Sequence, residues 1–341
     1  MNIKQTIKMF GIVVMIIAAI TVSAGCTSTQ QAGNSSNESS VHTTPDLVRA
    51  LYGKATVSGD TIVLTEGVRL ENASLIVPLG VTLDLTKEAL QLGNNVIFTV
   101  DGAVNAKAEG IIIDSTVENP ATINGNGIIY LKSKGRLFGV WEGRKLVLDG
   151  VTLVGLKDNN ESLMAVGNGG EFVMKSGKIM GNTLNGDIWG NGGGIIIIDG
   201  STFTMQGGMI SCNTTSGSNT GNAGGVRVSR GTFIMQGGTI SGNTAISGTN
   251  GSSGGGVQVN QGVFIMEGGT IYGKVDSLPS GTDAGLANSA RNASSLRVWE
   301  TTAKWGTGGT YTKGGIPQTG GSNILPSEGN SDDTLIAIPA Q

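Results

Sequence analysis

Residues 192–274 contain GGGIIIIDGSTFTMQGGMISCNT at 192–214, AGGVRVSRGTFIMQGGTISGNT at 223–244 and GGGVQVNQGVFIMEGGTIYGK at 254–274. These are three versions of one segment. The equivalent residues Phe203, Phe233 and Phe264 lie 30 and 31 residues apart, and a methionine follows each by two positions. Self-similarity at a fixed period of this size predicts a solenoid or another array of stacked units.

Each segment has the pattern of short strands. Phe-x-Met alternates with a period of two, as in a strand with one buried face, and Gly-Gly pairs follow at Gly207, Gly237 and Gly268. Because matching residues recur one segment later, we expect each strand to pair in parallel with its equivalent in the next copy. The sequence therefore predicts an all-β, single-stranded, right-handed parallel β-helix, in which equivalent Phe, Met and Ile side chains stack on strands about 4.8 Å apart.

The same register extends towards the N-terminus. We align the copies on the residue that follows the Phe-x-Met position. These reference residues, called anchors here, lie 23, 25, 26, 31, 30 and 31 residues apart, which gives at least seven copies. The anchors are Asp101, Asn124, Asp149, Lys175, Gln206, Gln236 and Glu267. We also expect Asn182, Asn213 and Asn243, at one corner of successive copies, to hydrogen-bond along the axis as a ladder.

The N-terminus has the pattern of a lipoprotein signal peptide over residues 1–25. Lys4 and Lys8 form a basic region that precedes an apolar run, Met9–Val22, and this run is short for a membrane span. The run ends in VSAGC, which resembles a bacterial lipobox. That resemblance implies that Cys26 is acylated, carries palmitate and anchors the chain to a membrane. Ordinary signal-peptide cleavage beside an incidental cysteine is the alternative, because Ser23 stands where such signals prefer Leu.

Three further segments follow the signal peptide. Residues 26–45 are rich in Ser, Thr, Asn and Gln and predict a flexible tether. Residues 46–305 are expected to form the β-helix, with a short helix over Pro45–Tyr52 that covers the open first copy. Residues 306–341 are rich in glycine and predict a loose C-terminal tail, in which only the final TLIAIPAQ has the pattern of a short edge strand.

Charge and motif content exclude several classes of partner. The net charge is −3, and no basic stripe exists that could neutralise nucleic-acid phosphates. Neither an EF-hand pattern nor a Gly-Gly-x-Gly-x-Asp calcium repeat occurs, so no metal site and no cofactor are predicted.

The copies GTFIMQGGTISGNTA and GGGVQVNQGVFIMEGG resemble the repeats of bacterial surface β-helix proteins, including autotransporter-type adhesins. This resemblance implies a β-helix on the cell surface or outer membrane, but a fold does not determine a function. We therefore expect a lipid-anchored envelope protein that acts as an adhesion-like binding module or as a structural element. Its expected partners are a polysaccharide or a host or cell-surface protein.

The alternative function is a polysaccharide lyase or glycoside hydrolase. Parallel β-helices resemble the pectate lyase-like superfamily, whose enzymes use outward carboxylates as acid and base or to bind calcium. The candidates here are Asp101, Asp149, Lys175 and Arg144, and calcium is expected only under this alternative. The predicted spacing of Asp101 and Asp149 is two strand levels, about 10 Å. That is slightly more than the roughly 6.5–9.5 Å of an inverting carboxylate pair. An exposed ion pair between Asp149 and Lys175 is the simpler interpretation.

The other candidate site is a binding surface formed by inserted loops. Residues 214–222 and 244–253 leave successive copies at the same corner, and insertions on one side of a repeat protein often mark its binding side. Asn219, Asn222, Asn250 and Ser252 supply uncharged hydrogen-bonding groups that suit a sugar or a peptide backbone. Tolerated surface insertion is the equally weighted alternative.

Overall fold

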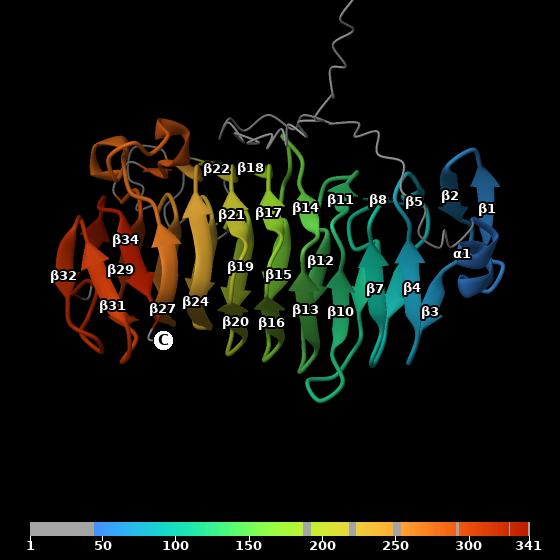
Figure 1. The fold of residues 1–341 in the computed structure, drawn as a ribbon, viewed down its shortest axis with the longest axis horizontal. Coiled ribbons are helices and arrows are strands. Elements are labelled where there is room, and N and C mark those ends of the chain that lie inside the picture. Colours follow the sequence, from blue (N-terminus) through green and yellow to red (C-terminus); the bar gives the residue numbers. More distant parts are fainter. Residues whose placement is uncertain are drawn as a thin grey trace, which may run out of the picture.

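The computed structural model describes residues 44–186, 192–217, 223–247, 254–290, 293–326 and 328–339. This part of the chain is all-β, with 4% helix and 52% strand, and its sheets are mostly parallel. Figure 1 shows the strands side by side along the long axis of the molecule, with helix α1 at the N-terminal end. The arrangement is consistent with a solenoid. The predicted signal peptide, residues 1–25, lies outside the described ranges.

One complete copy contributes four strands. In residues 192–217 these are β19 (Ile195–Ile198), β20 (Thr202–Met205), β21 (Met209–Ser211) and β22 (Thr214–Gly217). Each pairs in parallel with the next copy, which supplies β23 (Val226–Ser229), β24 (Thr232–Ser241) and β25 (Thr244–Ser247). The predicted pairing between equivalent strands is therefore confirmed.

Equivalent strands form rows along the axis, and the 20-stranded sheet contains two of these rows. The first row consists of β4 (Ser74–Val77), β7 (Ile97–Val100), β10 (Ala121–Asn124), β13 (Lys145–Asp149), β16 (Glu171–Met174), β20, β24, β27 (Val263–Ile271) and β30 (Thr302–Trp305). The second consists of β2 (Thr61–Leu64), β5 (Thr82–Leu85), β8 (Ala103–Ala106), β11 (Ile128–Leu131), β14 (Thr152–Val154), β17 (Lys178–Met180) and β21, and continues in β24 and β27.

Three smaller sheets complete the copies. The seven-stranded sheet contains β12 (Phe138–Val140), β15 (Met164–Val166), β19, β23, β26 (Val257–Asn260), β29 (Leu296–Trp299) and β33 (Asn330–Ser331). The four-stranded sheet contains β18 (Thr183–Asn185), β22, β25 and β28 (Ser289–Ala290). The three-stranded sheet contains β3 (Val68–Leu70), β6 (Leu90–Leu92) and β9 (Ile111–Ile113).

The core is a set of side-chain columns that run between copies. Phe172, Phe203, Phe233 and Phe264 are fully buried, and their successive ring centroids lie 5.0, 4.9 and 5.0 Å apart in stacked orientation. Equivalent methionines and isoleucines pair in the same register. The predicted stacking of like on like is confirmed. Its cause is the period of two, which places every second side chain on the inner face of each strand.

The corner asparagines form a buried ladder that is longer than predicted. The backbone N–H groups of Asn182, Asn213 and Asn243 each donate to the side-chain Oδ1 of the next asparagine, at 3.2, 3.1 and 2.9 Å. The ladder begins at Asn159, whose Nδ2 donates to Asn182, and ends at Asn288. Asn288 continues it because the chain makes a detour through the 3₁₀ helices Val275–Ser277 and Ala284–Leu286 before it returns to that corner.

One step of the predicted register is wrong. Asn124 pairs with Asp149 as expected, but its partner in the preceding copy is Thr99 and not Asp101. Asp101 instead lies beside Asn126, whose backbone N–H is 3.4 Å from the Asp101 carboxylate. A shift of two residues keeps the inward and outward faces unchanged, so the alternation of apolar residues did not reveal the error.

Both ends of the stack are covered. At the N-terminal end, α1 (Thr44–Ala50) contributes Leu47 to the core and is followed by the buried Leu51, and β1 (Ala55–Ser58) pairs antiparallel with β2. The predicted capping helix is therefore confirmed.

At the C-terminal end, the predicted loose tail is wrong. β31 (Thr310–Lys313), β32 (Ile316–Gln318) and β34 (Leu335–Ile338) pair antiparallel, and β34 also pairs with β27. Trp305 and Tyr311 stack at 5.4 Å and fill the end of the core. The edge strand predicted in TLIAIPAQ is thus present as β34.

Candidate functional site

The proposed catalytic carboxylates are not brought together. Asp101 and Asp149 lie in different axial columns, because Asp149 is aligned with Asn124 and Thr99. The Asp149 carboxylate accepts a hydrogen bond from Ser176 Oγ at 2.6 Å. Among the ion pairs of the described residues there is none between Asp149 and Lys175, so that prediction is wrong. An ion pair of the same axial kind is present instead between Asp199 and Arg230, at 2.6 Å.

Arg144 lies at the opposite end of β13 from Asp149. Five residue steps of extended chain, roughly 16 Å, separate their Cα atoms, so Arg144 cannot join a site built on Asp149. Its Nη2 instead lies 2.7 Å from the Asp114 carboxylate, which also contacts Arg69. Burial by itself raises the pKa of Asp114, but the hydrogen bond from Arg69 and the positive charges of Arg144 and Arg69 outweigh burial and hold that pKa below its usual value.

Several predicted functional residues fall outside the described part of the chain. These are the lipidation candidate Cys26 and the loop residues Asn219, Asn222, Asn250 and Ser252. Within the described ranges, no helix is long and apolar enough to span a membrane.

The structure points instead to Trp141, which follows β12 on the outer side of the seven-stranded sheet. Its indole lies close over two backbone positions that lack side chains. A Cβ built on Gly139 would lie 2.2 Å from the indole Nε1, and one built on Gly167 would lie 2.2 Å from Cζ3. The indole can therefore lie against the sheet only because both residues are glycine, one in each of two successive copies.

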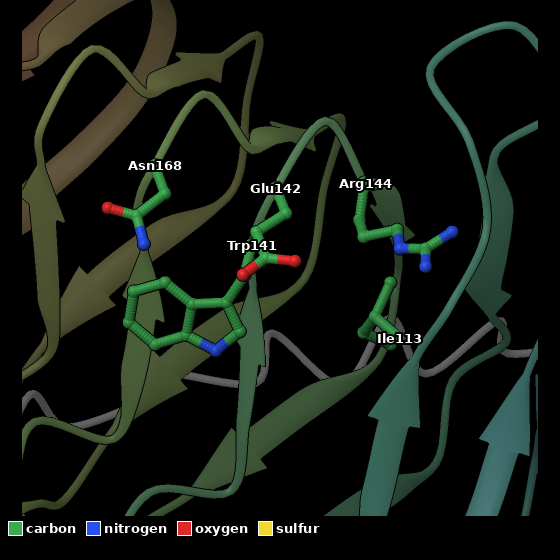
Figure 2. A pocket seen from close by; sticks show the side chains of 5 residues that line it. All are labelled: Ile113, Trp141, Glu142, Arg144 and Asn168. Carbon is green, nitrogen blue, oxygen red and sulfur yellow. The ribbon is translucent and has the colours of Figure 1, made fainter.

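A hollow of about 450 Å³ lies on one side of Trp141 (Figure 2). Its other lining residues are Ile113, Glu142, Arg144 and Asn168. In Figure 2, Glu142 lies above the indole, Asn168 extends from the neighbouring turn towards it, and Arg144 lies to the right beside Ile113 with its guanidinium directed away from the indole. The hollow thus combines one aromatic surface with polar groups from two copies.

A second hollow, of about 380 Å³, is also lined by Trp141. It is lined by Arg136, Trp141, Asn160, Glu161, Ser162, Ala165, Ile196 and Ile198. The guanidinium carbon of Arg136 lies 5.3 Å from the indole centroid, a cation–π contact, and its Nη2 lies 2.5 Å from the Glu161 carboxylate. We refer to Trp141 together with the linings of both hollows as the Trp141 surface.

The charges of the Trp141 surface largely cancel. Arg144 is paired with Asp114 and Arg136 with Glu161, whereas Glu142 has no ion-pair partner among the residues that the structure describes. Arg227, further along the same sheet, has unpartnered Nε and Nη1 atoms, but it is only 5% exposed and lines neither hollow. Its burial lowers its pKa to about 10. The surface therefore offers no exposed, uncompensated cation to an acidic ligand.

Glu142 and Asn168 have left-handed backbone, which in other proteins often marks a functional site. Here the same feature recurs at the equivalent turn of every later copy. The φ values are 50° at Glu142, 50° at Asn168, 49° at Asp199, 59° at Arg230, 52° at Gln261 and 46° at Glu300. We therefore interpret it as the geometry of the turn and not as catalytic strain.

The described residues contain no group of three or more His, Cys, Asp or Glu side chains placed to hold a metal ion. No protein-family model, no curated protein and no solved structure matches this chain significantly.

Proposed function

We propose that this chain is a right-handed parallel β-helix lipoprotein, anchored in the cell envelope through Cys26, whose Trp141 surface binds an uncharged carbohydrate. The supporting observation is the position of the Trp141 indole, which lies over Gly139 and Gly167 and lines two hollows. The parallel pairing of equivalent strands and the Phe column support the β-helix.

The chemistry of the Trp141 surface suits a sugar. A sugar ring has an apolar C–H face, which packs against an indole, and a rim of hydroxyl groups, which need donors and acceptors. Arg144, Glu142 and Asn168 supply these around the first hollow, and Asn160 and Ser162 supply them around the second. Arg136 and Arg144 are each paired with a carboxylate and so leave little net positive charge to attract an anion. An uncharged sugar is therefore favoured over a uronate.

Binding can be tested by titrating the full chain with neutral oligosaccharides and with uronate oligosaccharides of matched length. Neutral sugars should bind more tightly. Trp141→Ala should weaken that binding at least about tenfold, or 1.4 kcal/mol. Gly139→Val, which retains the indole but displaces it from the sheet, should have a similar effect. Leu79→Ala removes a side chain that is 79% exposed elsewhere and is the control.

Two results would contradict this proposal. One is tighter binding of uronates than of neutral sugars, and the other is unchanged binding by Trp141→Ala. The same incubations test for turnover. Because Asp101 and Asp149 do not form a carboxylate pair, we expect no release of unsaturated or reducing ends.

The lipid anchor needs a separate experiment. Cells that express the chain should incorporate labelled palmitate into it, and Cys26→Ser should abolish the incorporation. Leu79→Ala, which leaves both cysteines in place and changes only an exposed side chain, is the control and should retain the label. Equal labelling of the Cys26→Ser variant would exclude this anchor.

A further inference from the structure

Trp141 is the first residue of a row that runs along the edge of the seven-stranded sheet. Val140 pairs with Val166 and Val166 with Ile197, which places Trp141 beside Gly167 and Gly167 beside Ile198. Ile198 pairs with Ser229, Ser229 with Asn260, and Asn260 with Trp299. The row therefore begins and ends with tryptophan, and Figure 1 labels four of its strands, β12, β15, β19 and β29, in that order along the long axis.

Each of the two tryptophans has an arginine against its ring. The guanidinium carbon of Arg297 lies 5.4 Å from the Trp299 centroid, and that of Arg136 lies 5.3 Å from the Trp141 centroid. Nη1 of Arg297 donates to Asn330 Oδ1 at 2.6 Å, which holds the arginine in place. Trp299 remains 39% exposed although it is a large apolar residue. It is thus a second oriented aromatic surface that the core does not use.

Four residues lie between the tryptophans in this row. Gly167 has no side chain, Ile198 is half-buried and apolar, and Ser229 and Asn260 are half-buried with short polar side chains. Five strand-to-strand steps of about 4.8 Å separate the two tryptophans, roughly 24 Å in all. A single small sugar that contacts Trp141 cannot reach Trp299, whereas a linear oligomer aligned with the axis can.

The charges beside the row indicate which polymer fits. Nη2 and Nε of Arg230 donate hydrogen bonds to Asp199 Oδ1 at 2.6 and 2.9 Å, and Gln261 Nε2 donates to Glu300 Oε2 at 2.9 Å. Glu142 and Glu300 follow the row by one residue, and Arg227 and Arg297 lie in the neighbouring column of the same outward face, each in register with Gln258. The positive and negative charges beside the row therefore balance, so a polyanion gains no net attraction there and an uncharged chain is favoured.

We propose that Trp299 is a second binding subsite, and that a linear, uncharged polysaccharide lies along this row and contacts both Trp141 and Trp299. This inference rests on the proposed function, because it extends the Trp141 surface. A polysaccharide that contacts both tryptophans binds with avidity, because its second contact forms within the complex already made by the first. Short oligomers contact one tryptophan only.

The test is a length series of neutral β-1,4-linked oligomers of glucose, galactose and N-acetylglucosamine, titrated against the full chain. In the series that binds, affinity should rise at least about tenfold once the oligomer spans both tryptophans. Trp299→Ala should remove this gain and leave dimer binding at Trp141 unchanged. Ser229→Lys, which obstructs the middle of the row, should have the same selective effect. Leu79→Ala should change neither, and thermal melting should show that all variants are folded.

The outcomes separate this inference from the proposed function. If dimers bind and Trp141→Ala abolishes their binding, but Trp299→Ala leaves the affinity of long oligomers intact, the second subsite is refuted and the Trp141 surface stands. If no oligomer of any series binds, both are refuted.

Discussion

Replacing Asn213 by alanine tests how strongly the asparagine ladder holds successive copies together. The Asn213 side chain is fully buried. Its Oδ1 accepts from the Asn182 backbone N–H at 3.2 Å, and its Nδ2 donates to the Ile179 carbonyl at 3.0 Å and to Asn243 Oδ1 at 3.2 Å. Alanine leaves the Asn182 N–H buried without an acceptor.

The cost follows from these three contacts. An unsatisfied buried donor costs about 1–3 kcal/mol, and each of the two further lost hydrogen bonds costs about 1 kcal/mol. The expected loss in the free energy of unfolding is therefore about 3–5 kcal/mol. Asn185→Ala is the matched control on the neighbouring copy. It is exposed and makes one bond, to Asp158 at 3.1 Å, so its loss should stay within about 0.5 kcal/mol.

Urea unfolding followed by far-ultraviolet circular dichroism measures the free energy of unfolding of both variants, with one shared value for its dependence on urea concentration. The double variant Asn213→Ala/Asn243→Ala should cost less than the sum of the single variants, because both remove the same bond between the two side chains. A loss for Asn213→Ala no larger than that of Asn185→Ala would refute the ladder as a stabilising element.

Three further predictions concern the core, the charge network and the cap. Phe233→Ala should lower the free energy of unfolding by about 3–5 kcal/mol in urea, because it empties the middle of the phenylalanine stack, whereas Leu79→Ala should change it by under about 0.5 kcal/mol. Asp114→Asn should destabilise the chain at neutral pH but not in acid. The Asp114 carboxyl contacts Arg69, and its pKa is lower in the folded chain than in the unfolded chain. Its contribution to the free energy of unfolding is therefore present above the unfolded-state pKa and is lost as pH falls through the folded-state pKa. A difference in stability between the variant and the parent chain that stays constant from neutral pH to acid would contradict this. Leu51→Asp, which places a carboxylate at the covered end of the core, should lower the melting temperature and increase association in size-exclusion chromatography, and a monomer with unchanged melting would contradict the capping role of this end.

The stacked core could be predicted because its pattern repeats within the sequence. Phe203, Phe233 and Phe264 recur with matching neighbours, so parallel pairing in register is the arrangement that buries all of them alike. The register near Asp101 could not be determined in this way. A shift of two residues preserves the face of every side chain, and hydrogen bonding between copies selects between the two registers.

The C-terminal cap and the Trp141 surface were not predicted, for a related reason. Trp305, Tyr311 and Leu335 are dispersed among glycines and polar residues, and they form a cluster only when β34 folds back against β27 and β31. Similarly, Trp141 is one aromatic residue in a turn until Gly167 of the next copy lies beneath its indole.

The sequence alone determined the direction of stacking and the inner face of each strand, because side chains alternate with a period of two and the copies repeat. Which turn residues of different copies become neighbours depends on the three-dimensional fold. Copies differ in length by several residues, so the contact between Trp141 and Gly167, and the row that connects Trp141 to Trp299, depend on how each connecting segment closes and not on any local pattern.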